Sequence, residues 1–544
     1  MLVAEAAARA LVASAGVECA FGLVGSGNFH LTNALVAAGA RFVAARHEAG
    51  AAVMADAYAR TSGRLGVLTL HQGPGVTNAL TGIAEAAKSR TPLLVLAADT
   101  GAAGARSNFR LDQAALAAAV GATHERAATA ASAVCDVLRA AQRAVVERRT
   151  VLVSLPLDVQ AGEAVVPAAR RWPRPAVPLP DPASVTALAD LLAAARRPVL
   201  IAGRGARDPG AAAAIAALAE RCGALLSTSA VAKGLFGAGP WHLDVAGGFA
   251  SPPAAELIAG ADAVVAFGCT LNMWTTRHGR LLGPGAAVAQ VDVEPEALHA
   301  NPRVGLGVLG DAAATATAVL AELAARGHAS TGYRAAPLPS VRWRDVPYDD
   351  ETGDGRIDPR TLSARLDDLL PAARTVSVDS GNFMRYPSMY LAVPDTAGFC
   401  FTQAFQSVGL GLATAIGAAV ARPDRLPVAA LGDGGFLMGV SELETVVRLG
   451  LPMLVVVYDD AAYGAEVHHF GPGGDPLDTV TFPDTDLAAI ARGYGCAAAT
   501  VRSPADLAVV GEWLAGPRER PLLLDAKVTA SHGSWWLEEA FRGH

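Results

Sequence analysis

The stretch LGDGGFLMGVSELETVVRLGLPMLVVVYDDAAYGAEVHHF, residues 431–470, decides the fold of this chain. It follows an apolar segment, residues 426–431, that predicts a buried strand ending in the Gly-Asp-Gly turn at 432–434. The apolar residues 453–458 predict a second strand. A strand, helix, strand unit with a right-handed crossover brings the ends of both strands to the same edge of a parallel sheet.

The segment between these two strands predicts a helix. Ser441 and Glu444 have the spacing of a helix capping box, and an apolar stripe follows them. The shared sheet edge would let Asp433 and Asp460 converge on one cation. Two carboxylates beside a glycine turn are suited to holding a diphosphate through magnesium.

Composition describes a folded protein and excludes several classes of function. A length of 544 residues predicts about three domains, and 52% hydrophobic residues indicate large buried cores. A net charge of -7 without a basic run argues against nucleic acid or an anionic membrane as partner. The absence of a signal peptide pattern, of an apolar run of about 18 residues and of paired cysteines favours a cytoplasmic protein.

The first part of the chain alternates predicted helices and strands. Its first three strands are predicted at residues 18–23, 41–45 and 66–70. Ser26, Glu48 and His71 each come shortly after one of these strands. This is the edge at which open α/β sheets bind ligands, so the three side chains are candidates for one site.

These motifs resemble the thiamine diphosphate-dependent enzymes of the acetolactate synthase, benzoylformate decarboxylase and pyruvate decarboxylase family. In that family Gly-Asp-Gly is followed, 27 residues after its Asp, by the second of two Asn residues. Here 460 minus 433 is also 27, although the pair is Asp459-Asp460. The resemblance implies that Mg²⁺ is bound by Asp433, Asp460 and the backbone carbonyl of Ala462. It implies that the cofactor is bound by Glu48, Val408, Gly432, Asp433, Gly434, Gly435, Tyr463 and Gly464.

The resemblance also implies catalytic residues. The segment 46–60 is similar to the acetolactate synthase stretch that carries the glutamate sharing a proton with the cofactor's pyrimidine ring, and Glu48 has that position. Ser26 and His71 resemble a pair in the benzoylformate decarboxylase branch that lines the substrate side of the thiazolium ring. His71 either transfers protons there or is a structural hydrogen-bonding residue. Val408 has the position of the apolar side chain that separates the two cofactor rings.

The resemblance covers nearly the whole chain and implies an α/β protein with three doubly wound parallel-sheet domains. These would be a pyrimidine-binding domain at 1–165, a central domain at 185–328 and a diphosphate-binding domain at 357–544. The central domain binds FAD in some members, but nothing in this sequence supports FAD. Because members build each site from two subunits, we expect a homodimer or a dimer of dimers, with Glu48 reaching across the interface.

The implied reaction is decarboxylation of a small-molecule 2-oxo acid, followed by release of an aldehyde or by carboligation to an acceptor. Ser26, His71, His468 and His469 would form a polar substrate pocket. The alternative is a subunit that binds the cofactor without catalysis, because Asp460 adds a negative charge beside the diphosphate. A nicotinamide oxidoreductase is disfavoured, because the glycines at 22, 25 and 27 have the spacing G-x-x-G-x-G rather than G-x-G-x-x-G.

Overall fold

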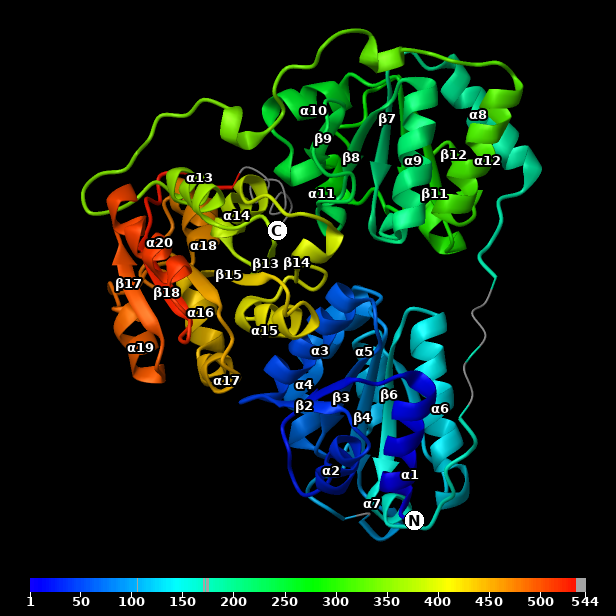
Figure 1. Cartoon of the computed structure of the whole chain (residues 1–544), viewed down its shortest axis with the longest axis vertical. Helices are drawn as coiled ribbons and strands as arrows, with labels where there is room; N and C mark the ends of the chain where they lie inside the picture. Colours follow the sequence, from blue (N-terminus) through cyan, green and yellow to red (C-terminus); the bar gives the residue numbers. More distant parts are fainter. Residues whose placement is uncertain (105, 170–171, 173–175, 535–544) are drawn as a thin grey trace.

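Three parallel β-sheets follow one another along the chain. The structure, a computed structural model, describes residues 1–104, 106–169, 172 and 176–534. Each sheet has six strands, all strand pairs are parallel, and helices lie on both faces of the sheets (Figure 1). The predicted fold class, α/β with three doubly wound parallel sheets, is confirmed.

The first sheet has the strand order β2-β1-β3-β4-β6-β5. Its strands are β1 (Cys19–Gly22), β2 (Arg41–Ala44), β3 (Gly66–Leu70), β4 (Leu93–Asp99), β5 (Thr123–Arg126) and β6 (Thr150–Pro156). Its helices are α1 (Val3–Ala10), α2 (Phe29–Ala37), α3 (Glu48–Ser62), α4 (Pro74–Lys88), α5 (Gln113–Ala119), α6 (Ala130–Val146) and α7 (Leu157–Gln160). The strands expected at 18–23, 41–45 and 66–70 correspond to β1, β2 and β3, so the period of apolar residues located them within one residue at each end.

The second sheet has the order β12-β11-β10-β7-β8-β9. Its strands are β7 (Pro198–Ala202), β8 (Leu225–Thr228), β9 (His242–Val245), β10 (Ala263–Phe267), β11 (Ala287–Asp292) and β12 (Leu306–Leu309). Its helices are α8 (Pro182–Ala194), α9 (Pro209–Cys222), α10 (Pro252–Ala259), α11 (Met273–Thr276) and α12 (Ala312–Ala325). Counted from its own first strand this order is 3-2-1-4-5-6, the arrangement of dinucleotide-binding sheets, which defines a topology and not a function.

The third sheet has the order β14-β13-β15-β16-β18-β17, which is the order of the first sheet. Its strands are β13 (Arg374–Val378), β14 (Phe399–Phe401), β15 (Leu426–Gly432), β16 (Leu454–Asp459), β17 (Ala497–Val501) and β18 (Leu522–Lys527). Its helices are α13 (Pro359–Leu369), α14 (Arg385–Tyr390), α15 (Gly411–Ala421), α16 (Asp433–Gly439), α17 (Glu442–Arg448), α18 (Gly464–Phe470), α19 (Leu487–Tyr494) and α20 (Ala508–Ala515). The first and third sheets are therefore two copies of one topology.

The helix expected between the strands at 426–431 and 453–458 is divided in two, and the capping box is wrong. Ser441 lies between α16 and α17, and its side chain makes no capping hydrogen bond. Glu444 pairs with Arg448 on the same helix instead. The neighbouring Glu442 is buried, and its Oε1 accepts hydrogen bonds from the backbone N–H groups of Arg46 and His47 in the first domain at 3.0 and 3.1 Å. A contact between distant segments thus replaces the local cap.

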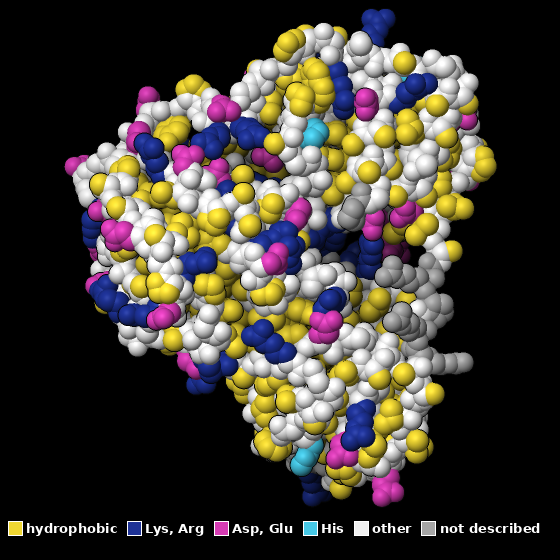
Figure 2. Space-filling view, viewed as in Figure 1, with side chains coloured by type: hydrophobic (Ala, Val, Ile, Leu, Met, Phe, Trp, Pro, Cys, Tyr) yellow, Lys and Arg dark blue, Asp and Glu magenta, His cyan; other side chains and the backbone are white. Residues whose placement is uncertain are grey.

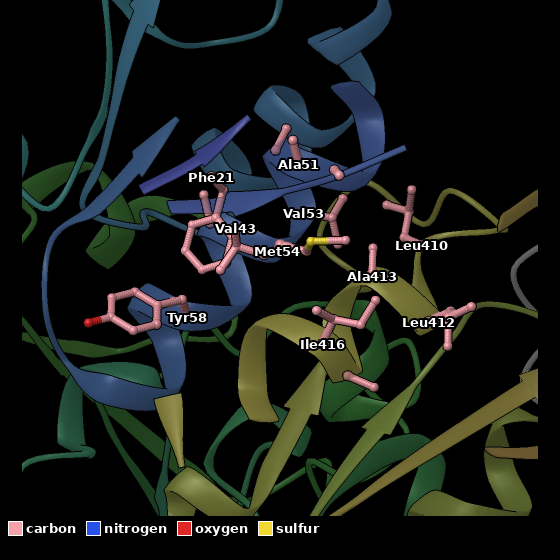
Figure 3. Packing of buried hydrophobic residues seen from close by; sticks show 14 of the residues in the cluster. Phe21, Val43, Ala51, Val53, Met54, Tyr58, Leu410, Leu412, Ala413 and Ile416 are labelled. Atoms are coloured by element: carbon pink, nitrogen blue, oxygen red, sulfur yellow. The ribbon is translucent and has the colours of Figure 1, made fainter. Parts of the chain in front are cut away.

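The first and third domains pack against each other through α3 and α15. Apolar side chains of both helices belong to one buried cluster, and Figure 3 shows Met54 and Val53 of α3 beside Ala413 and Ile416 of α15. Small residues allow the two backbones to approach closely. A Cβ atom added at Gly417 would lie 2.2 Å from the carbonyl oxygen of Met54.

Three further properties bear on where the protein acts. Within the described residues, no helix is long and apolar enough to cross a bilayer. All six cysteines are free, and five are buried, with Cys135 exposed. Acidic and basic side chains are interspersed on the face shown in Figure 2, without a large area of one sign. The cytoplasmic location stays a prediction.

The helix contact at Gly417 gives a stability test. We expect Gly417→Ala to lower the melting temperature by several degrees, because the added methyl group forces α15 away from α3. Gly493→Ala is the matched control, since Gly493 also lies in a helix and a Cβ there meets nothing within 4 Å. That control should leave stability unchanged or raise it by roughly 0.5–1 kcal/mol through helix propensity. Equal melting temperatures of the two variants would contradict the close packing.

Candidate active site

A cavity of about 370 Å³ lies at the carboxyl end of the third sheet. Strands β15 and β16 pair in parallel with Gly432 opposite Tyr458, so both strands deliver the residues that follow them to the same place. The predicted residues that line the cavity are Val408, Gly432, Asp433, Gly434, Gly435, Asp460, Ala462, Tyr463 and Gly464. The structure therefore brings together the third-domain residues that were expected to hold the cofactor and the cation, and their roles stay predictions.

Two carboxylates meet at this cavity, with Asp433 buried and Asp460 partly buried. Burial raises the pKa of Asp433 to about 8, and the charges of Asp460 and Asp459 contribute to the rise. Burial likewise raises the pKa of Asp460 to about 6, with a contribution from Asp459. Among the described residues, neither Asp433 nor Asp460 forms an ion pair with a basic side chain. Two neighbouring carboxylates without an ion-pairing partner match the donor set that a divalent cation requires.

Glycines let the backbone pass close to these side chains. A Cβ at Gly434 would lie 2.6 Å from Cε1 of Tyr463, and one at Gly464 would lie 2.4 Å from Oδ2 of Asp460. A larger residue at either position would displace the aromatic ring or the carboxylate. The glycines are thus required by the packing of the loops, in addition to any contact with a ligand.

Asp379 supports the cavity wall and was not among the residues expected from sequence. It follows β13, is fully buried, and accepts hydrogen bonds from the backbone N–H groups of Gly409 (3.0 Å) and Leu410 (3.1 Å). These bonds hold the segment that carries Val408, whose side chain is 38% exposed and lines the cavity. The signal in the sequence was an aspartate directly after an apolar strand, which is a common position for ligand-supporting residues.

The candidate residues of the first domain form a second cluster. Glu48 begins α3, is 8% exposed, and its Oε2 accepts a hydrogen bond from Nδ2 of Asn78 at 3.1 Å. His71 Nδ1 accepts a hydrogen bond from the backbone N–H of Gly27 at 3.0 Å. Burial lowers the pKa of His71, while the nearby charge of Glu48 opposes that shift. Ser26 directly precedes Gly27, so Ser26, Glu48 and His71 lie in one region.

The two clusters are separate within one chain. The described residues lining the cavity come from the third domain and from Met273 and Trp274 of the second, and none comes from the first. Ser26, Glu48 and His71 are therefore not brought to Asp433 and Asp460 inside a single subunit. A complete site containing all of them needs a second copy of the chain, and this assembly stays a prediction.

Helix α18 presents a carboxylate to the cavity. Glu466 lines it, whereas His468 and His469 do not. His468 is packed against Gly533, and its Nε2 is buried with no hydrogen-bond partner among the described residues. The ring of His469 contacts Phe470 edge-on, with 4.6 Å between the ring centroids. The substrate role expected for these histidines stays a prediction.

Comparison with known proteins connects this geometry to a family. Three family models match in chain order: the thiamine pyrophosphate enzyme N-terminal TPP binding domain at residues 1–117, the central domain at 185–319, and the C-terminal TPP binding domain at 379–526. The chain belongs to the thiamine diphosphate enzyme family. Its cofactor-binding domains are therefore those that contain Glu48 and Asp433.

Individual relatives of this thiamine diphosphate enzyme differ in activity. The chain is 33% identical over 516 residues to a protein of Pseudomonas aeruginosa named "Probable 2-ketoarginine decarboxylase", covering 91% of this chain and 88% of the relative. It is 30% identical to a sulfoacetaldehyde acetyltransferase of Alcaligenes xylosoxydans xylosoxydans, covering 86% and 82%. A Rhodococcus jostii RHA1 thiamine diphosphate-dependent 4-hydroxybenzoylformate decarboxylase has the same fold, with a TM-score of 0.84 at 21% identity over 98% of this chain and 100% of that one.

The buried charge of Asp433 gives a test of the candidate cation site in the metal-free protein. Its pKa of about 8 in the folded state exceeds the ordinary 3.8, so the unfolded state releases its proton first as the pH rises. The free energy of unfolding of the wild-type protein should therefore fall as the pH rises from the lower to the higher of these two values. The variant Asp433→Asn should lose less stability, melt a few degrees higher at pH 8 without Mg²⁺, and be stabilised less by Mg²⁺ than wild type.

Melting curves from pH 5 to 8 check this prediction. Asp475→Asn is the control, because Asp475 is exposed and lies outside the cavity lining. It should retain both the pH dependence and the Mg²⁺ response of wild type. Parallel pH profiles for Asp433→Asn and wild type would contradict the assignment of a buried, repelled carboxylate.

Proposed function

We propose that this chain is a thiamine diphosphate- and Mg²⁺-dependent enzyme that decarboxylates a 2-oxo acid and then releases an aldehyde or transfers the remaining group to an acceptor. The observation that carries the proposal is the pair formed by the buried Asp433 and the partly buried Asp460 beside a glycine-lined cavity, in a chain that also buries Glu48. The decarboxylases among the relatives support the first half of the reaction, and the acetyltransferase supports group transfer as the second.

Asp433, Asp460 and the carbonyl of Ala462 would hold Mg²⁺, and Val408 would support the cofactor from the cavity wall. When bound, the cofactor supplies a carbanion that adds to the keto carbon and accepts the electrons left by carbon dioxide. Glu48 would hold a proton at the pyrimidine ring, and the hydrogen bond from Asn78 to its Oε2 fixes the orientation of its carboxyl group. Glu466 is the further carboxylate at the cavity and is placed to exchange protons with substrate.

A homodimer or a dimer of dimers would complete the site. Glu48 and the cavity are apart in one chain, and exposed apolar side chains lie beside the cavity, including Val408 and Met438. Exposed apolar surface next to a functional cavity is typical of a surface that another subunit covers. In the assembly Glu48, Ser26 and His71 of one subunit would face the cavity of the other.

The competing function is a subunit that binds the cofactor without turnover, and Asp460 is the observation that favours it. Isothermal titration with thiamine diphosphate and Mg²⁺, followed by carbon dioxide release from a panel of 2-oxo acids, separates the two. The panel should contain 2-oxo acids with cationic, aromatic and small aliphatic side chains, and sulfoacetaldehyde should be assayed separately. Binding followed by turnover supports the enzyme, and binding without turnover on any substrate supports the idle subunit.

Glu48→Gln separates proton transfer from cofactor binding. The amide keeps the size of the side chain but cannot share a proton, so turnover should fall by about 10²–10⁴-fold while cofactor affinity stays within a few-fold. Glu5→Gln is the matched control, because Glu5 is an exposed glutamate in the first turn of α1. Unchanged turnover in Glu48→Gln would remove Glu48 from the mechanism.

Asp460→Asn tests the unusual ligand. An amide oxygen still coordinates Mg²⁺, and removing one of two adjacent negative charges lowers repulsion toward the diphosphate. We expect cofactor affinity measured by isothermal titration to be equal to or tighter than that of wild type. Loss of Mg²⁺-dependent binding in this variant would show instead that the carboxylate at 460 is required.

A further inference from the structure

The turn that carries the proposed cation ligands has a strained backbone. Ala461 has a φ of 56°, in the left-handed region that residues with a side chain rarely adopt. Its backbone N–H donates to Oδ1 of Asp459 at 2.9 Å, so the side chain of Asp459 closes the turn. Ala462, the next residue, is bridged to Thr481. The positions of the Asp460 carboxylate and the Ala462 carbonyl therefore depend on Asp459 being held in place.

Lys527 holds Asp459 from the neighbouring strand. Strand β18 pairs in parallel with β16 so that Lys527 lies opposite Asp459. Its Nζ donates to Oδ2 of Asp459 at 2.6 Å and to the carbonyl of Thr485 at 2.8 Å. Both side chains of this ion pair are 3% exposed. The two oxygens of Asp459 thus have separate partners, one in the turn and one on β18.

The chemistry of lysine suits this position. The sequence contains only three lysines among 44 lysine and arginine residues, and Lys527 is one of them. Its Nζ also lies 2.6 Å from Asp484 and 3.2 Å from Asp525. A compact ammonium group can direct its three hydrogens to several acceptors in a confined space, whereas a planar guanidinium group needs acceptors in its own plane.

The charges at this sheet edge have different partners. Asp459 and Asp460 are adjacent in sequence, yet Lys527 pairs with Asp459, which does not line the cavity. Asp460 lines it and has no ion pair among the described residues. A buried carboxylate that loses its counter-ion is strongly destabilised, so the turn with Asp459 requires Lys527.

We propose that Lys527 is a positioning residue for the cation site: by neutralising and fixing Asp459, it sets the 459–462 turn that presents Asp460 and the Ala462 carbonyl. This inference rests on the proposed function only in placing a cation at Asp433, Asp460 and Ala462. Lys527 itself does not line the cavity and acts through Asp459.

A rescue experiment tests the proposal through Mg²⁺ affinity, measured by isothermal titration of the full-length protein with thiamine diphosphate present. Lys527→Met should weaken Mg²⁺ binding by about tenfold or more, because it leaves Asp459 buried and unpaired. The double variant Lys527→Met/Asp459→Asn should return to within about threefold of wild type. The asparagine keeps an oxygen for the N–H of Ala461 but carries no charge that needs a partner.

Lys233→Met is the matched control, because Lys233 is also a buried lysine and donates to the carbonyl of Ser388, outside the cation site. It should keep the Mg²⁺ affinity of wild type. Unchanged affinity in Lys527→Met, or a folded double variant that binds Mg²⁺ about tenfold more weakly than wild type, would overturn the proposal. If Lys527→Met does not fold, the double variant alone decides it. Failure of wild type to bind Mg²⁺ would instead overturn the proposed function, and this inference with it.

Discussion

The parallel pairing of β15 with β16 is the constraint on which the cavity depends. Because the two strands run parallel, both end at the same edge, and Asp433 and Asp460 enter one cavity. This arrangement is unfavourable in the protein alone, since burial raises the pKa of both, and repulsion adds to the rise, from Asp460 and Asp459 at Asp433 and from Asp459 at Asp460. The fold keeps this arrangement because the sheet core fixes the strands regardless of the charges at their ends. The site is thus preorganised for a cation by the surrounding apolar packing.

Buried carboxylates also join the first and third domains, where they accept backbone hydrogen bonds instead of facing a cavity. Glu442 accepts two backbone hydrogen bonds next to α3, and Glu85 accepts those of Ala404 and Phe405 beside the segment that leads to Val408. Each buried carboxylate here is satisfied by N–H groups of the other domain. The first and third domains are therefore joined by polar contacts at the ends of the apolar contact between α3 and α15.

The sequence predicted the features that depend on local residue patterns. It missed the features that depend on contacts between segments far apart in the chain. The strand at 66–70 and the residues around Asp433 follow from apolar period and motif spacing, and the structure contains them as expected. The capping box at Ser441 is absent, and the neighbouring Glu442 binds amides 395 and 396 residues away, a contact that no local pattern reveals. Lys527 could not be assigned from sequence, since only the order of β16 and β18 brings it to Asp459. The domain limits and the roles of the site residues stay predictions.

Asp459 and Asp460 are adjacent and chemically identical, yet they have different roles at the edge of the sheet. Asp459 points toward β18, where Lys527 and the N–H of Ala461 use both of its oxygens, so its charge is neutralised inside the protein. Asp460 is turned to the cavity by the left-handed conformation of the next residue, and its charge is left for a ligand. An asparagine at 459 would close the same turn without a lysine. The buried lysine at 527, one of only three lysines in the chain, is therefore explained by the aspartate that it neutralises.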